Sequence, residues 1–391
     1  MSAHDVLITG IGIVSSLGEG AETHWNVLAA GGVEPRIDSE RYAPFTIHPL
    51  PEIDWSRQIP KRGDQRQMET WQRLGTYTAG LALEDAGIKD DDALCASMDM
   101  VVAAGGGERD EAVDASILAA SRARRDHEVL LNEKLTTELR PTLFLAQLAN
   151  LLAGNISIVH KVTGSSRTFM GEEGSGVSAI ATAAARIRSG QATHMLVGGA
   201  FQTEHPDMLL GYEVGGYLHR GPHAPVWKRK GSAGGGLVSG SGSAFLVLES
   251  REHAASRGRR AYGRLVSVAQ GRAKRDDLEA AIEGMYAQVQ GDDADIVISG
   301  ASGAHAATSA EKAVLDRHGA AVRAFSTLTG HIREAQFPFA VALAALAVGQ
   351  GKAFPPLGPS EKQADGTVKS ALATAIGYHF FEGVAHIAAA E

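Results

Sequence analysis

Short apolar runs that end in small residues recur along the chain, and runs of this kind are typical of buried strands. They cover residues 6–14, 98–104, 194–199, 244–248 and 296–299. Between them lie amphipathic stretches that are long enough for helices, at residues 65–85, 141–152, 175–189, 277–290 and 308–318. Because strands and helices alternate, the pattern predicts a layered α/β fold.

The length of 391 residues corresponds to two or three units at roughly 150 residues per domain. Pro- or Ser-rich linkers are absent from the sequence, and residues 355–369 are predicted to be a polar loop within one body. We therefore expect two closely associated halves, residues 1–250 and residues 251–391.

Composition excludes several classes of protein. Lys and Arg number 37 against 45 Asp and Glu, a net charge of −8 without a long basic run, which disfavours nucleic-acid binding. The single cysteine, Cys95, excludes a disulfide framework and favours a reducing compartment. Neither a signal peptide nor an apolar run of the roughly 18 residues that span a bilayer is present. We expect a cytoplasmic protein without a membrane span, a metal or a cofactor.

Simple chemical motifs are incomplete in this chain. The opening TGIGIVSSLG has Ser15 where the third glycine of a dinucleotide-binding turn should stand. The run KGS at 230–232 lacks the upstream glycine of a phosphate loop, and prolyl and glycyl residues between His219 and His223 disfavour a helical metal site. Cys95 has no helix start after it to activate its thiol. None of these motifs predicts a site.

The segment 164–190, GSSRTFMGEEGSGVSAIATAAARIRSG, is more informative. It predicts a short strand, a tight turn and an Ala-rich helix that begins near Ser175. Such a turn presents a side chain at a helix N-terminus, where the dipole favours negative charge. That side chain is Glu172 or Glu173. If Glu173 is structural, its carboxylate should accept hydrogen bonds from the first N–H groups of the helix.

With this segment the sequence resembles the β-ketoacyl-acyl carrier protein synthases, the condensing enzymes of the thiolase-like fold. The resemblance runs nearly from end to end. Its landmarks are VLITGIGIVSSLG, QRQMETWQRLGTYTAGLALEDAGI, PTLFLAQLANLLAGNISIVHKVTG, THMLVGGA, GLVSGSGSAFLVLESREHAASRGRRAYGRL and LTGHIREAQFPFAVALAALAVGQG. The resemblance implies an α-β-α-β-α body of two stacked halves rich in βαβ units.

Members of the family use a nucleophilic cysteine, two histidines and a lysine, with an oxyanion hole near a C-terminal glycine-rich loop. Counted from Gly164, the cysteine position falls on Glu173. The first histidine position falls on Gly300 or Ser299, with His305 several residues beyond it, and the lysine position falls on Ser326. The second histidine alone is matched, as His331 in LTGH. Because a carboxylate carries no acyl thioester, the resemblance implies a subunit that does not condense.

The resemblance also implies positions for an acyl pocket and for a dimer interface. GYHFFEG replaces the family's glycine-rich loop, so that His379, Phe380 and Phe381 stand where small residues should leave room for the acyl chain. The predicted strand 167–170 resembles the segment that pairs across the family's dimer axis, and its Phe169 and Met170 require cover. The apolar helix predicted at 332–349 should be interrupted by Pro338.

The leading interpretation is a subunit of the chain-length-factor type. It would pair with an active β-ketoacyl synthase that receives substrate from an acyl carrier protein, and it would shape the acyl pocket in fatty acid synthesis, including very-long-chain, lipid-linked synthesis, or in polyketide synthesis. The resemblance leaves open whether the chain forms a homodimer or a heterodimer. Alternatives are a stand-alone malonyl-carrier decarboxylase, hydrolase or synthase that uses Glu173 and His331, and a carrier-binding module that docks an acidic carrier on Lys228, Arg229 and Lys230.

Overall fold

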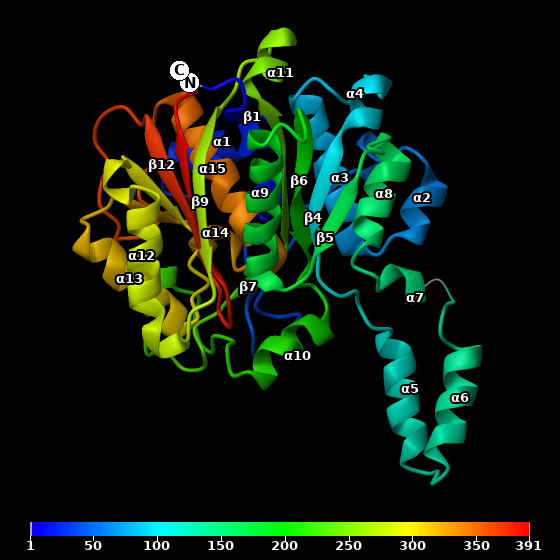
Figure 1. The fold of residues 1–391 in the computed structure, drawn as a ribbon. Coiled ribbons are helices and arrows are strands. Elements are labelled where there is room, and N and C mark those ends of the chain that lie inside the picture. Colours follow the sequence, from blue (N-terminus) through cyan, green and yellow to red (C-terminus); the bar gives the residue numbers. More distant parts are fainter. Residues whose placement is uncertain (1, 142, 391) are drawn as a thin grey trace.

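The computed structural model describes residues 2–141 and 143–390, and its centre is one twisted mixed sheet (Figure 1). The strand order is β11-β10-β12-β13-β9-β1-β8-β6-β4-β5, with β2 paired to β1. The bounds are β1 Val6–Ser15, β2 Gly18–Glu19, β4 Asp99–Ala103, β5 Ser166–Phe169, β6 His194–Phe201, β8 Gly242–Ser250, β9 Gly263–Gly271, β10 Ile296–Ser299, β11 Val322–Ala324, β12 Ser370–Ile376 and β13 Glu382–Ala388. A separate small sheet pairs β3 Ile47–His48 with β7 Ser239–Gly240.

Helices cover both faces of each half of the sheet. Two of them, α9 Glu172–Arg188 and α15 Gln336–Gln350, form the middle layer and contact strands of both halves. One outer layer is α3 Thr70–Asp85 with α8 Leu151–His160, and the other is α12 Leu278–Gln288 with α13 His305–Arg317. The remaining helices are α1 Ala21–Ala30, α2 Arg62–Gln67, α4 Asp92–Ser97, α5 Glu111–Ser121, α6 His127–Thr137, α7 Leu143–Ala146, α10 Pro206–Val214, α11 Arg251–Ser256 and α14 Ser326–Thr329. The five layers confirm the predicted thiolase-like α/β fold.

The glycines of the opening motif serve helix packing. A Cβ on Gly10 would lie 2.5 Å from the carbonyl oxygen of Ala82, and one on Gly12 would lie 2.2 Å from that of Thr78. Both carbonyls belong to α3, so the absence of side chains lets α3 lie directly on β1. The motif that resembles a dinucleotide-binding turn is therefore a close contact between a strand and a helix.

Three helix predictions need correction. The stretch 65–85 is divided at Met68, because Glu69 caps α3 in a reciprocal capping box with Gln72. The stretch 141–152 contains the short α7 and only the start of α8. Pro338 does not interrupt the apolar helix that was predicted at 332–349. The helix, α15, begins at Gln336, so Pro338 lies in its first turn, where the backbone N–H groups have no hydrogen-bond partner within the helix.

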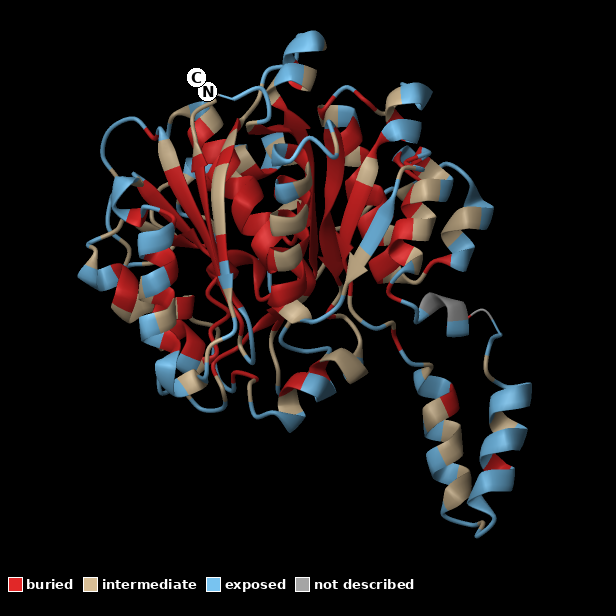
Figure 2. Cartoon of the chain, in the orientation of Figure 1, coloured by how far each residue is buried: buried red, intermediate tan, exposed pale blue. Residues whose placement is uncertain are grey.

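The pair α5 and α6 forms a hairpin that projects away from the layered body (Figure 1). Most of its surface is exposed or half-buried, in contrast to the buried strands (Figure 2). Apolar side chains nonetheless lie on it, including Leu118, of which 66% is exposed. The sequence did not predict this hairpin, because its residues show no clear apolar face towards the body.

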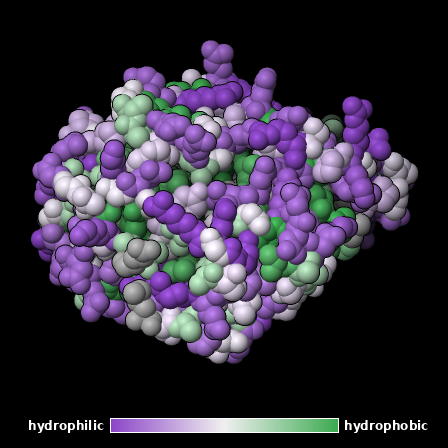
Figure 3. All heavy atoms as spheres, turned by 90° about the horizontal axis from the view of Figure 1, so that it is seen from above, coloured by the Kyte–Doolittle hydropathy of each residue, from purple (hydrophilic) through white to green (hydrophobic). Residues whose placement is uncertain are grey.

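The face seen from above in Figure 3 is largely hydrophilic, with apolar side chains scattered between charged ones. Most of the exposed large apolar side chains fall between residues 118 and 170. Within the described residues we find no helix with the length and apolar content needed to cross a bilayer.

Two buried histidines predict a loss of stability in mild acid. Burial lowers the pKa of His24 and of His160 to about 4 in the folded chain. The unfolded chain takes up these protons near pH 6.5, so between pH 6.5 and 4 it binds more protons than the folded chain does. The free energy of unfolding should therefore fall as the pH falls, by about 2 kcal/mol per histidine between pH 7 and pH 5.

Urea unfolding followed by circular dichroism between pH 7 and pH 5 measures this loss. His24→Gln should show a shallower pH dependence than the wild type, whereas a control change at the exposed His4, His4→Gln, should leave it unaltered. Equal slopes for all three proteins would contradict the assignment.

Candidate functional site

The turn between β5 and α9 places two glutamates at the centre of the molecule. The chain leaves β5, passes Gly171 at φ 121°, and enters α9 at Glu172, which itself has φ 54°. The helix thus begins at Glu172, earlier than the predicted Ser175. Glu173 is fully buried. A left-handed conformation at a glutamate is uncommon and marks this turn as constrained by its surroundings.

Glu173 is bonded to the matched histidine. Its Oε1 atom lies 2.7 Å from Nε2 of His331, and the backbone N–H of Tyr378 donates to the same oxygen at 3.1 Å. The other ring nitrogen of His331, Nδ1, lies 3.0 Å from the hydroxyl of Tyr212. Burial raises the pKa of Tyr212 well above its ordinary value, so its phenol donates to Nδ1 and the Nε2–H group donates to Glu173.

The donors to Glu173 correct one expectation. We expected N–H groups at the start of its own helix, but the bonds come from His331 and Tyr378, which are 158 and 205 residues away in the chain. The second carboxylate oxygen, Oε2, is buried without a hydrogen-bond partner. Glu173 therefore holds three separate segments of the chain together.

A charged pair, Glu172 and Arg333, lies beside the bond between Glu173 and His331. The phenol of Tyr378 donates to Oε1 of Glu172, and Nη2 of Arg333 lies 3.8 Å from the same oxygen. Burial raises the pKa of the Glu172 carboxyl, and the neighbouring Glu173 raises it further. Arg333 also faces Glu334 at 3.8 Å and packs over the ring of Tyr212. The centre thus combines carboxylates with one arginine in a buried setting.

The positions predicted for the first histidine and the lysine, Gly300 and Ser326, meet at Gln336. Its Nε2 group donates to the carbonyl oxygen of Gly300 at 2.9 Å and to Oγ of Ser326 at 2.8 Å, while its Oε1 accepts from the N–H of Ile332. A Cβ on Gly300 would lie 2.5 Å from the carbonyl oxygen of Thr374 and 3.2 Å from Cγ of Gln336. Position 300, one of the two predicted for the first histidine, therefore has no room for a side chain.

The loop between β12 and β13 lies over the turn at Glu172. A Cβ on Gly174 would lie 2.6 Å from Cβ of Phe381, so the phenylalanine is set against the first turn of α9. Arg272 stacks over the rings of Phe380 and Phe381, which are 37% and 40% exposed.

The predicted pocket residues do not converge on one point. Phe169 packs against the core between the layers, whereas Met170 is 66% exposed at the end of β5. The ring of His379 packs at a tilt against the ring of Phe380 in the β12–β13 loop. Their role in an acyl pocket stays a prediction.

The remaining sequence candidates lie apart from this centre. Arg229 is fully buried, so the prediction that it faces an acidic carrier with Lys228 and Lys230 is wrong for this residue. Burial raises the pKa of the Cys95 thiol to about 11, and the thiol lies near the carbonyl of Ile88. In the part of the chain that the structure describes, no three His, Cys, Asp or Glu side chains form a metal-binding group.

Hydrogen bonds from His331 and Tyr378 hold the buried carboxylate of Glu173. The turn between β5 and α9 therefore presents no exposed nucleophile at this position. Sequence reasoning found Glu173 and His331, but it missed Tyr212, Tyr378 and Gln336, which fix them. These three have no spacing or periodicity in common. Topology alone brings them to the same place.

Comparisons with known proteins agree with this fold. A family model described as the β-ketoacyl synthase N-terminal domain matches residues 3–254. The 3-oxoacyl-[acyl-carrier-protein] synthase 2 of Vibrio cholerae is 26% identical over 276 residues, 68% of this chain and 63% of that protein, so the match spans less than two thirds of the relative. The tetracenomycin polyketide synthase ketoacyl synthase β subunit of Streptomyces glaucescens is 27% identical over 365 residues, 88% of this chain and 85% of that subunit.

Solved structures are similar over nearly the whole chain. The ishigamide ketosynthase/chain length factor has a TM-score of 0.78 at 22% identity and covers 99% of both chains. A type II polyketide synthase acyl-carrier protein in complex with its ketosynthase bound to the hexaketide gives a match with a TM-score of 0.71 at 19% identity, also over 99% of both chains.

Proposed function

Because the chain belongs to the β-ketoacyl synthase family, whose N-terminal domain model matches residues 3–254, we propose that it is a non-condensing subunit. It pairs with an active synthase and helps to set acyl-chain length in fatty acid or polyketide synthesis, in the cytoplasm. The acyl group reaches the pair on an acyl carrier protein. The carbon–carbon bond forms in the partner, which supplies the cysteine, both histidines and the lysine.

The observation that carries the proposal is the closed state of the nucleophile position. Glu173 is fully buried, its Oε1 is held by His331 and Tyr378, and Phe381 lies against the next residue, Gly174. Acyl transfer needs an exposed nucleophile beside a base, with room for a tetrahedral intermediate. Here a carboxylate takes the place of the nucleophile and its hydrogen bonds serve the fold.

The edge of the sheet supports pairing with another chain. β5 bonds only to β4 and has a free edge, and edge strands of this kind need to be covered. Exposed apolar side chains lie close to it in the chain, with Phe144 and Met170 both 66% exposed and Ile158 60% exposed. Together with Leu118 on the projecting α5–α6 hairpin, they supply apolar surface that a partner chain can cover.

We expect the isolated chain to acquire no acyl group. After incubation with acyl-acyl carrier protein, intact-mass spectrometry should show the unmodified mass, because no thiolate stands at the turn. A cysteine-containing synthase treated in parallel is the positive control. A stoichiometric acyl adduct on any residue of this chain would refute the proposal.

A CO₂-release assay on the same purified chain distinguishes the proposed non-condensing subunit from a stand-alone decarboxylase. If Glu173 were a base, Glu173→Gln would lower CO₂ release from malonyl-carrier protein by roughly two to four orders of magnitude. We expect the wild type alone to release none above background. We also expect the pair with an active synthase to condense at the same rate with either form. Release by the wild type alone that the mutant loses would establish the decarboxylase instead.

Pairing is tested at the edge of the sheet. Met170→Asp places a charge on the exposed apolar surface beside β5 and should weaken the complex with a co-expressed synthase about tenfold or more. Ala255→Asp is the control, since Ala255 is also exposed and its helix, α11, lies at the opposite end of the body from the end of β5 (Figure 1). Size-exclusion chromatography and native mass spectrometry measure the 1:1 complex. If both variants pair like the wild type, the interface lies elsewhere.

A further inference from the structure

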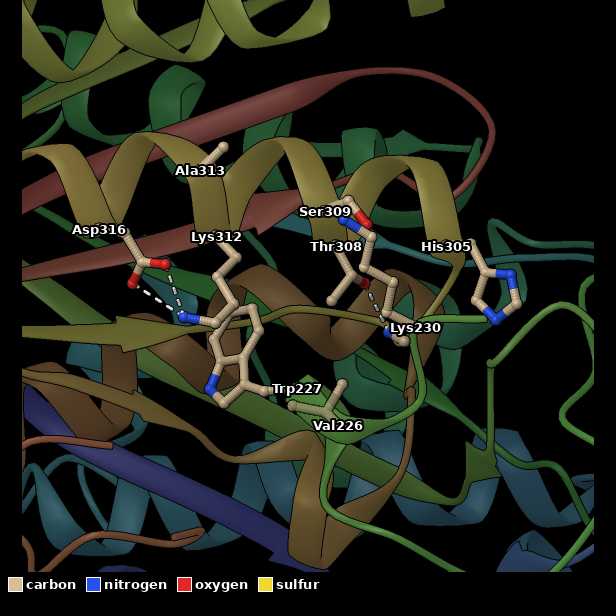
Figure 4. Close-up of a pocket in the computed structure, with 10 residues that line it drawn as sticks. Val226, Trp227, Lys230, His305, Thr308, Ser309, Lys312, Ala313 and Asp316 are labelled. Atoms are coloured by element: carbon tan, nitrogen blue, oxygen red, sulfur yellow. Dashed lines mark hydrogen bonds and ion pairs between the residues drawn. The ribbon is translucent and has the colours of Figure 1, made fainter. Parts of the chain in front are cut away.

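A cavity of about 290 Å³ lies between α13 and the loop that contains Trp227, apart from the Glu173 centre (Figure 4). The side chain of Trp227 lies along one wall, and its Nε1–H group donates to Oε1 of Glu361 at 3.2 Å, which fixes the plane of the indole. The polar residues that line the cavity are Lys230, His305, Thr308, Ser309, Lys312 and Asp316.

The cavity contains more positively charged groups than carboxylates to pair with them. Lys312 binds Asp316 at 2.8 Å and lies 5.8 Å from the indole of Trp227, so that pair is neutral. Lys230 has no carboxylate partner among the described residues, and Figure 4 shows its side chain extending along the first turns of α13 toward Ser309. The N-terminal end of a helix carries partial positive charge, so an ammonium group placed there is repelled.

A buried arginine adds to the positive potential. Arg229 is fully buried without a carboxylate partner, and its Nη1 group has no hydrogen-bond partner. A Cβ on Gly303, which lines the cavity, would lie 3.2 Å from this Nη1 group, so the guanidinium stands directly behind the cavity wall. Burial lowers the pKa of Arg229 to about 9, as expected for a cation without a counter-charge.

We propose that this cavity binds the phosphate group of a small phosphate ester. Lys230 and the hydroxyl of Ser309 donate to the phosphate near the start of α13, and the organic part of the ester lies against the indole of Trp227. An anion here relieves the repulsion between Lys230, Arg229 and the positive end of the helix. A phosphate meets this need better than a neutral ligand, because it brings up to two negative charges and several acceptor oxygens. The site is independent of the subunit's proposed role in acyl-chain synthesis.

Isothermal titration calorimetry on the full chain, in chloride buffer of constant ionic strength, tests the proposal with three probes. Inorganic phosphate and adenosine 5′-monophosphate should bind saturably, the nucleotide more tightly, whereas adenosine should not bind. Lys230→Gln should weaken binding of both phosphate compounds about tenfold or more, since it removes a charged donor. Lys352→Gln, a change at an exposed lysine outside the cavity, is the control and should have no effect.

Trp227→Phe should weaken binding of the nucleotide more than that of inorganic phosphate, since only the nucleotide has a ring to place on the indole. The proposal is overturned if neither phosphate compound binds, if adenosine binds as well as the nucleotide, or if Lys230→Gln and Lys352→Gln have equal effects. Thermal unfolding of each variant without ligand shows that the fold is intact, so a loss of binding reports the site.

Discussion

Replacing His331 by alanine should lower the free energy of unfolding by about 1.5 to 3 kcal/mol, because it removes the imidazole N–H donor from the buried Glu173 carboxylate, and hydrogen bonds to charged groups contribute about that much. The change leaves the Glu173 carboxylate buried with a single donor, the N–H group of Tyr378, and opens a cavity beside Tyr212. Urea unfolding at pH 7 measures the loss. Glu173→Gln should cost only about 1 kcal/mol, because a neutral side chain keeps most of the hydrogen bonds.

The double variant Glu173→Met/His331→Leu tests the same contact by removing both partners at once. Replacing both partners by apolar residues of similar volume leaves no unpaired charge, so this variant should be more stable than the sum of its single changes predicts. A loss below about 1 kcal/mol for His331→Ala, or simple additivity in the double variant, would contradict a structural role for the pair.

Restoring the family's catalytic residues should fail to restore condensation. We expect Glu173→Cys alone to give no detectable product, and Glu173→Cys/Gly300→His to be inactive and less stable than the single variant. The histidine has no room, because its Cβ would lie 2.5 Å from the carbonyl oxygen of Thr374. Overpacking of this kind costs roughly 1 to 3 kcal/mol.

Thermal unfolding and a condensation assay with malonyl- and acyl-carrier protein measure both effects. Gly284→His is the matched control, since the position of its Cβ on α12 has no atom within 4 Å and the change should leave stability nearly unaltered. Condensation by Glu173→Cys/Gly300→His would show that the site still has the geometry for catalysis and lacks only its nucleophile and histidine.

The sequence predicted only part of the sheet: it located β1, β4, β5, β6, β8 and β10 and missed β9, β11, β12 and β13. The strands β1, β4, β6, β8 and β10 are continuous apolar runs that are buried on both faces, so each has its own signal. The helices of the middle layer were also visible, although their exact starts were not. The α5–α6 hairpin was missed because mixed polar and apolar residues on a projecting hairpin leave no period that points to the body.

The candidate site was predicted only in part. Glu173 and His331 were found by their positions in the family's motifs. Their bond, and the parts played by Tyr212 and Gln336, depend on contacts between segments that are 119 to 158 residues apart, or on a side chain that fills the space above Gly300. That the β12–β13 loop fills acyl space stays a prediction, and the contact of Phe381 with α9 was not foreseen. Such relations follow from tertiary packing alone.

The amide of Gln336 acts as a brace between the two predicted positions, Gly300 and Ser326. It bonds to both and to the backbone of Ile332 at once, so a larger side chain at either position would have to displace it or break one of these bonds. A histidine at position 300 alone would therefore cost stability before it could take part in any chemistry.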